Sequence, residues 1–111
     1  MRDDRARLRD ILQALDRIQS EAAQGRQAFE ADPKFQVWVR YLLQIVGEAC
    51  RGLSGEFRAQ FPDDVWSKAI GLRNILIHHY FEIDQELVWQ VVQMDLPAFR
   101  LAVESALRRF S

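Results

Sequence analysis

The 111-residue sequence is poor in cysteine, in turn-forming residues and in long apolar runs. Its single cysteine, Cys50, cannot form an intramolecular disulfide, so we expect a reduced, half-buried structural thiol of the kind found in the cytosol. No apolar run approaches the ~20 residues that a membrane-spanning helix needs. The charged stretch at residues 1–10 lacks the apolar centre of a signal peptide. These absences predict a soluble, cytoplasmic protein with no membrane partner.

The sequence also lacks an excess of charge of either sign. It has 15 basic and 16 acidic residues and a net charge of −1, which argues against a strongly basic protein that coats nucleic acids without selectivity. A local basic cleft is compatible with this balance. Arginines gather near the start of the chain, where a solvated helix face explains them at least as well as an RNA-binding track does: Arg2, Arg5, Arg7 and Arg9.

What the sequence does contain is apolar side chains at helical spacing. Apolar residues make up 49% of the chain, enough for one domain over residues 1–111. Stripes with a spacing of three or four residues occur in four segments: Leu8 to Ile18, Phe35 to Ala49, Trp66 to Leu72, and Phe99 to Phe110. There is no hairpin signal and no sustained alternation. The sequence therefore predicts an all-α fold, an up-and-down four-helix bundle with one additional short helix.

The second of these helices has the clearest start and the most apolar composition. Asp32 offers a cap and Pro33 stands at the first helical position, a strong start signal. Gly47 lies inside this helix, where glycine costs ~1 kcal/mol relative to alanine. We interpret Gly47 as a point where another helix approaches closely.

Later boundaries are marked by acidic residues and proline. We expect Asp63 or Asp64 to cap the third helix, and Asp84 to cap a segment that follows it. Asp95 and Pro97 predict one more break before the last helix.

The residues best suited to chemistry lie at positions 73–80, R-N-I-L-I-H-H-Y. Arg73 is a permanent cation that suits a phosphate or an oxyanion. His78 titrates near neutral pH and is a natural general acid or base. Together they supply what RNA cleavage through the ribose 2′-hydroxyl requires, and that reaction needs no metal.

The spacing of this pair favours a shared site. Arg73 and His78 are five residues apart, so roughly 140° separates them around an ideal helix. In a two-fold dimer, the same helix from each protomer can line one cleft and pool these groups. A surface arginine and histidine with no catalytic role are the simpler alternative, but the apolar residues 75–77 predict a mostly buried segment.

Two further residues, His79 and Glu48, are assigned structural roles. His79 shares a face with Leu72 and Leu76, so we predict a core or interface histidine rather than a catalyst. No cysteine or third histidine is available beside it for zinc, and we expect no metal and no cofactor. Glu48 lies on the most apolar helix and should meet a partner there, with Arg73 as one candidate.

The motif R-x4-H-x-Y is formed by Arg73, His78 and Tyr80, with Asn74 directly after the arginine. It resembles the motif of the HEPN superfamily, and within it of the HepT-like toxin ribonucleases that are paired with minimal nucleotidyltransferase antitoxins in type VII systems. The resemblance extends to I-V-G-E-A-C-R-G-L-S (45–54), F-P-D-D-V-W-S-K-A-I-G-L-R-N (61–74) and Y-F-E-I-D (80–84). One departure is Asp64-Val65, where relatives often carry isoleucine-proline.

The resemblance implies an all-α homodimer that cleaves RNA as a metal-independent endoribonuclease. Arg73 and His78 would be catalytic, and Asn74 would support them. It also implies that a cognate antitoxin neutralises the protein by attaching AMP to Tyr80, for which a simple packing role is the alternative. Two other classes of protein remain: a non-catalytic helical substrate-binding subunit of a nucleotidyltransferase, against which the intact motif argues, and a structural dimerisation protein, which only the apolar content supports.

Overall fold

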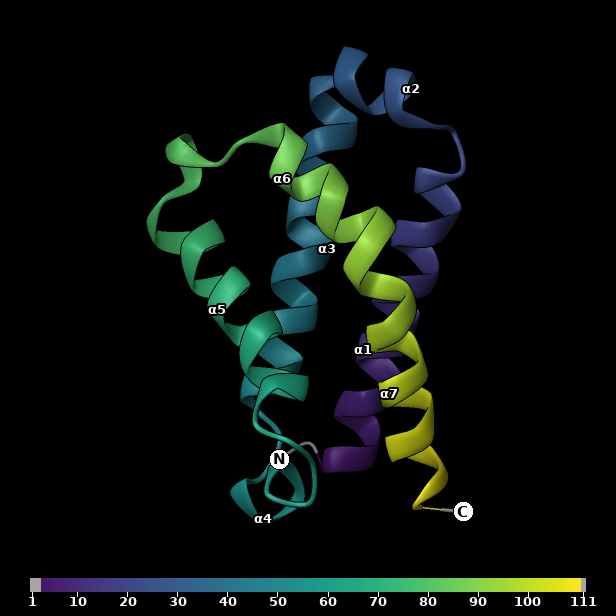
Figure 1. Cartoon of the computed structure of the whole chain (residues 1–111), viewed down its shortest axis with the longest axis vertical. Coiled ribbons are helices and arrows are strands. Elements are labelled where there is room, and N and C mark those ends of the chain that lie inside the picture. The colour runs from purple at the N-terminus through teal and green to yellow at the C-terminus, as the bar shows by residue number, and fades with distance from the viewer. Residues whose placement is uncertain (1–2, 111) are drawn as a thin grey trace.

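Four long helical segments run alternately up and down the molecule (Figure 1). They are α1 (Asp4–Ala22), α3 (Pro33–Arg51), α5 (Asp64–His78) and a C-terminal run made of α6 (Gln85–Gln90), η2 (Val91–Asp95) and α7 (Leu96–Arg108). The structure, a computed structural model, describes residues 3–110 and has no strand in that range, so Arg2 of the N-terminal arginines lies outside it. The prediction of an all-α four-helix bundle is confirmed.

Two short α-helices join the long ones, where the sequence predicted one: α2 (Arg26–Ala31) and α4 (Gly55–Arg58). The additional helix α2 begins directly after Gly25, whose φ of 96° is a backbone conformation that favours glycine and separates α2 from α1. Phe29 then fixes α2 to the bundle. Its fully buried ring packs edge-on against Phe35, with 5.3 Å between ring centroids, and lies 5.1 Å from the ring of Trp89.

The core lies between α1, α3 and the C-terminal run. It buries the apolar stripes that the sequence predicted, including Leu8, Ile11, Leu15 and Ile18 of α1, Val39, Leu42 and Val46 of α3, and Val103 and Ala106 of α7. Each such leucine or isoleucine contributes about 1.5–3 kcal/mol relative to an exposed one. Helix α5 packs against α3 at the edge of this core and buries only Trp66 and Leu76 completely. The helix that carries the motif is therefore the most exposed of the long helices.

The predicted caps of α3 and α6 are confirmed, whereas Asp63 precedes α5 as predicted but its side chain makes no capping bond. The side chains of Asp32 and Asp84 each accept a hydrogen bond, at 2.9 Å, from the backbone N–H two residues later, and Pro33 is the first residue of α3. Helix α5 begins at Asp64, and the preceding Asp63 makes no such bond. Asp63 has helical backbone angles, φ −53° and ψ −36°, whereas a capping side chain needs an extended backbone.

The predicted break at Asp95 and Pro97 is wrong, because the C-terminal run passes through both residues. The segment η2 is a π-helix, in which the N–H of Leu96 donates to the oxygen of Val91, five residues earlier. This wider turn precedes Pro97, which then sits in the first turn of α7, where its missing N–H costs little. The helix continues where the sequence indicated a new start.

Cys50 is completely buried in α3 rather than half-buried. Burial raises the pKa of its thiol from 9.0 to about 12, an effect that the charge of Arg58 offsets only in part. The thiol is free, and its surroundings are those of a structural core residue.

None of the helices within residues 3–110 combines the length and the apolar character that crossing a membrane requires.

Candidate active site

Helices α3 and α5 cross at Gly47, and this crossing decides where Arg73 lies. A β-carbon at Gly47 would lie 2.7 Å from the backbone oxygen of Ala69 and would overlap the side chain of Arg73. Only glycine allows α5 to come this close to α3. The predicted close approach at Gly47 is confirmed, and its partner is the helix that carries the motif.

The side chain of Arg73 is held from two directions. Its Nη2 lies 2.8 Å from Oε2 of Glu48, and its Nη1 donates to Oδ1 of Asn74 at 3.0 Å. The Arg73 side chain is 16% exposed, whereas that of Glu48 is 59% exposed. The arginine is therefore mostly buried, and the carboxylate that holds it faces solvent. The partner of Glu48, which the sequence left open, is Arg73.

His78 is the last residue of α5 and its side chain is exposed. The imidazole makes no hydrogen bond to any described residue, so both ring nitrogens are available to a ligand. Arg73 contacts Glu48 and Asn74 rather than His78, as their angular separation on one helix predicts. The single chain thus brings Arg73 and Asn74 together and leaves His78 apart from them.

One prediction about the surroundings of the motif is wrong, and the core role that the sequence offered for His79 is excluded. Ile75 and Ile77 are each 43% exposed, so of the three apolar residues only Leu76 is buried. His79 is exposed as well, and its Nδ1 lies 3.0 Å from Oε2 of Glu82, so it is not a core histidine, whereas its role at an interface stays a prediction. The reason is that α5 ends one residue earlier: His79 has φ −130° and ψ 37°, so its side chain leaves the helix face on which the prediction relied.

Tyr80 opens the short 3₁₀ helix η1 (Tyr80–Glu82) and packs against Arg40 of α3. The guanidinium carbon of Arg40 lies 4.9 Å from the centroid of the Tyr80 ring. Its Nη1 and Nη2 donate to the backbone oxygens of Tyr80 and Ile83, each at 3.1 Å. Arg40 is 5% exposed and has no acidic partner within residues 3–110. Sequence reasoning missed it, and the only signal was an arginine inside the most apolar helix.

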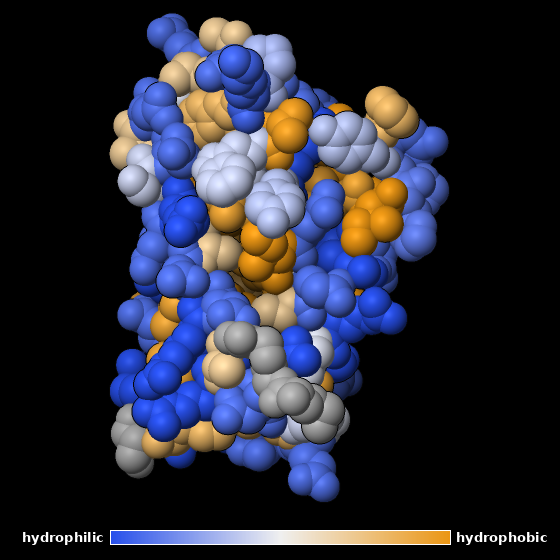
Figure 2. Space-filling view, turned by 180° about the vertical axis from the view of Figure 1, so that it is seen from behind, coloured by the Kyte–Doolittle hydropathy of each residue, from blue (hydrophilic) through white to orange (hydrophobic). Residues whose placement is uncertain are grey.

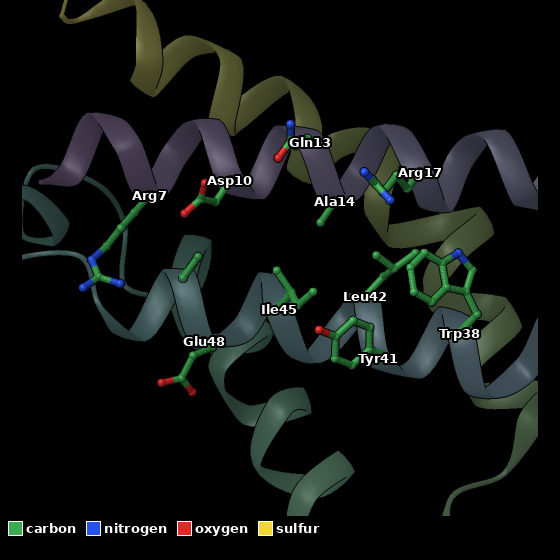
Figure 3. A pocket seen from close by; sticks show the side chains of 11 residues that line it. Arg7, Asp10, Gln13, Ala14, Arg17, Trp38, Tyr41, Leu42, Ile45 and Glu48 are labelled. Carbon is green, nitrogen blue, oxygen red and sulfur yellow. The ribbon is translucent and has the colours of Figure 1, made fainter. Parts of the chain in front are cut away.

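The site continues into a hollow of about 460 Å³ between α1 and α3 (Figure 3). Glu48, the partner of Arg73, lines one end of it, and Trp38 lines the other. A second, more apolar groove of about 680 Å³ runs between α5 and the C-terminal run, and Ile75 and Met94 contribute to its lining. Among the described side chains, no group of three His, Cys, Asp or Glu residues is placed to hold a metal ion.

Comparison with known proteins identifies the family. The sequence model of the family described as "Ribonuclease HepT-like" matches residues 11–106, which include the whole motif. The protein named "Putative RNase MJ1380" from Methanocaldococcus jannaschii is 40% identical over 104 residues, which cover 93% of this chain and 95% of that protein. The "Probable ribonuclease HepT" of Thermococcus cleftensis is 31% identical over 94 residues, 84% of this chain and 86% of its own. No solved structure matches the chain. The chain belongs to the HepT-like ribonuclease family, as its motif predicted.

Proposed function

We propose that this protein is a metal-independent endoribonuclease whose catalytic residues are Arg73 and His78. One observation carries the proposal: an anchored arginine and an exposed, unpartnered histidine lie five residues apart at the end of the same helix. Glu48 and Asn74 orient the arginine, which prepares a fixed positive charge for a phosphate. The histidine is accessible, as a group that exchanges protons with a substrate must be.

The proposed reaction uses the 2′-hydroxyl of RNA as the nucleophile. The imidazole of His78 accepts the hydroxyl proton, and the 2′-oxygen attacks the neighbouring phosphorus. Arg73 stabilises the negative charge that builds on the phosphorane, and Asn74 keeps the guanidinium in place. The bond from phosphorus to the 5′-oxygen then breaks, and this oxygen takes a proton from the counterpart of His78 on a second protomer. The products are a 2′,3′-cyclic phosphate and a 5′-hydroxyl end, and DNA is not a substrate.

The active form in this proposal is a homodimer in which the ends of two α5 helices line one cleft. The apolar side chains that flank His78 support it: Phe81 is 97% exposed and Ile77 is 43% exposed. A second protomer would cover such side chains, which rarely gather on a monomer without a binding role. It would also place the Arg73 of one protomer near the His78 of the other, so that the two groups act on one phosphate.

We further propose that the domain, residues 1–111, acts in the cytoplasm as the toxin of a toxin–antitoxin pair. A cognate minimal nucleotidyltransferase would transfer AMP from ATP to the phenol oxygen of Tyr80, with release of pyrophosphate and of the phenol proton. Arg40 fixes the ring and backbone of Tyr80 in the turn directly after α5. A phosphate attached there would repel RNA and would occlude the site beside His78.

The test of the nuclease is cleavage of single-stranded RNA in EDTA by the wild-type protein, His78→Ala and Arg73→Ala. We expect His78→Ala to cut about 10²–10⁴ times more slowly, the usual range for losing a general acid or base. The matched control is His79→Ala, an exposed histidine one residue away, which should cut like wild type. A substrate with a single 2′-deoxynucleotide at the cut site should resist cleavage. Equal rates for His78→Ala and wild type would refute the assignment.

The test of the modification is the intact mass after incubation with the partner nucleotidyltransferase and ATP. We expect wild type to gain AMP and Tyr80→Phe to gain none. Tyr41→Phe is the matched control, because Tyr41 is the other of the two tyrosines in the sequence and is 52% exposed. A wild-type dimer that binds the partner enzyme but cuts no RNA would instead favour a substrate-binding subunit of the nucleotidyltransferase.

A further inference from the structure

We propose that the hollow between α1 and α3 is a subsite for single-stranded RNA, which holds nucleotides next to the bond that is cut. The inference rests on the ribonuclease activity proposed above and adds to it the class of substrate. It is carried by three features of the hollow: an accessible aromatic pair, an unpaired arginine and a continuous path to Arg73.

The aromatic pair is formed by Trp38 and Tyr41 on α3. Their rings stack with 5.7 Å between centroids and an angle of 25° between planes, and Tyr41 is 52% exposed. By contrast, Trp66 and Trp89 are 1% and 8% exposed and serve the core. An accessible stacked pair at the edge of a hollow is a platform on which a nucleobase can stack, whatever its identity.

The unpaired arginine is Arg17 of α1. It is exposed and makes no ion pair or hydrogen bond with any residue that the structure describes. Figure 3 shows Arg17 on α1 and Trp38 on α3 at the same end of the hollow, so a phosphate bound by Arg17 would lie at the end where a base stacks on the aromatic pair. Arg7 lines the other end of the hollow, but its guanidinium already packs against Gly52. The contact is so close that a β-carbon at Gly52 would overlap the guanidinium.

The middle of the hollow is suited to base edges rather than to phosphate. Asp10 and Gln13 of α1 line it between the two arginines (Figure 3). A carboxylate repels a phosphate but accepts hydrogen bonds from the amino groups of bases, and an amide both donates and accepts. The phosphate contact is therefore placed at the Arg17 end, and base contacts are placed along α1.

The path to the cleavage site follows one stripe of α3. Trp38, Tyr41, Ile45 and Glu48 all line the hollow at spacings of three or four residues. Trp38 and Glu48 are ten positions apart, which corresponds to about 15 Å of helix, the length of a few nucleotides. Glu48, at the end of the stripe, is the residue that holds Arg73. A strand whose phosphate lies at Arg73 would thus reach the aromatic pair within a few nucleotides.

Figure 2, which views the molecule from behind, shows that the surface on this side mixes pale and orange side chains with blue ones. Such a mixture suits an unpaired strand, which presents flat bases and charged phosphates together. In a duplex, paired bases could not reach the ring faces. We therefore expect a preference for single-stranded RNA.

The experiment compares kcat/KM for a dinucleotide, which contains the scissile bond but is too short to span the ~15 Å of helix from Glu48 to Trp38, with kcat/KM for a single-stranded octanucleotide. We expect Arg17→Ala and Tyr41→Ala to reduce the advantage of the octanucleotide about tenfold each, as losing a phosphate contact or a stacked base does. The matched controls are Arg9→Ala, another exposed arginine of α1 that does not line the hollow, and Leu101→Ala, an exposed apolar residue of α7. Both controls should keep the full advantage.

Binding of the octanucleotide to His78→Ala, followed by fluorescence anisotropy, separates this inference from the proposed activity. We expect the added Arg17→Ala or Tyr41→Ala change to weaken binding about tenfold. Cleavage by wild type with an unchanged octanucleotide advantage in both variants would overturn the subsite and leave the nuclease intact. Loss of the dimer in Tyr41→Ala, measured by sedimentation, would make the hollow a protein interface and would also overturn the subsite. If wild type cuts neither substrate, the proposed activity fails, and the binding comparison alone decides about the subsite.

Discussion

Gly47 of α3 lies directly against the side chain of Arg73 on α5, with no space for a β-carbon between them. The next residue, Glu48, holds the guanidinium of the same arginine at 2.8 Å. Two consecutive residues of α3 therefore determine both how close α5 comes and where its cation points. Gly47, which has no side chain, thus helps to position the proposed catalytic residue Arg73.

Gly47→Ala should lower the free energy of unfolding by about 1–3 kcal/mol, because the added methyl group must push α5 away from α3. RNA cleavage should fall further than stability explains, since Arg73 moves with α5. Gly71→Ala is the matched control: it lies on α5 with no atom within 4 Å of the new methyl group, and alanine should raise helix stability by up to about 1 kcal/mol. Urea unfolding and cleavage rates measure both, and equal effects of the two variants would contradict this account.

Glu48→Gln should reduce kcat for RNA cleavage about tenfold, because an amide holds the Arg73 guanidinium less firmly than a carboxylate does. Stability should change by less than about 1 kcal/mol, since Glu48 is 59% exposed. Asp64→Asn removes a different exposed ion pair of α5, that with Lys68 at 4.0 Å, and should leave kcat as in wild type. A loss of kcat in both variants would point to a general effect of charge instead.

Arg40→Met should loosen the turn that presents Tyr80. The backbone oxygens of Tyr80 and Ile83 lose their donors, which should cost about 1–3 kcal/mol of stability. Hydrogen exchange measured by mass spectrometry should speed up in residues 80–83. Arg100→Met is the control, because Arg100 joins α7 to Gln19 of α1, far along the chain from this turn. If exchange in residues 80–83 rises equally in both variants, Arg40 has no special role in placing Tyr80.

Phe81→Asp should weaken the proposed homodimer at least tenfold, since a charge would replace a side chain that is 97% exposed in the single chain. Analytical ultracentrifugation over a range of concentrations gives the dissociation constant. Met94→Asp, at a methionine that is 75% exposed on η2, is the matched control and should leave the dimer unchanged. A dimer disrupted by Met94→Asp and not by Phe81→Asp would move the interface to the groove between α5 and the C-terminal run.

Cys50 should make stability depend on alkaline pH. In the folded protein burial raises the pKa of the thiol to about 12, whereas the ordinary value is 9.0. Between these values only the unfolded chain releases the proton, so the free energy of unfolding should fall by about 1.4 kcal/mol per pH unit as the pH rises. Urea unfolding from pH 8 to pH 11 measures this, and Cys50→Ala should flatten the slope by that amount. An identical slope in Cys50→Ala would mean that other groups cause it.

Local signals in the sequence were sufficient where the structure depends on neighbouring residues. The apolar stripe from Leu8 to Ile18 specifies a buried helix face by its spacing alone, and Asp32 with Pro33 marks a helix start through bonds within three residues. The motif identified the family for the same reason, because its residues are close in the chain. The catalytic roles of Arg73 and His78 remain predictions.

Tertiary structure decided whatever depends on a partner from another helix. The sequence placed Glu48 and Gly47 on an apolar helix, but only the crossing of α3 and α5 showed that both act on Arg73. Arg40 escaped notice because its partners, the backbone oxygens of Tyr80 and Ile83, lie about forty positions away.

The wrong predictions at the ends of helices have a related cause. The core alternative for His79 rested on helical periodicity, which holds only while the helix continues, and α5 ends at His78. At Pro97 the helix continues instead of ending, because a π-helical turn precedes the proline and places it in the first turn of α7. The sequence by itself determined which faces are apolar and which family the chain belongs to. Packing between helices determined which side chains meet, because this depends on contacts between distant segments that sequence spacing does not encode.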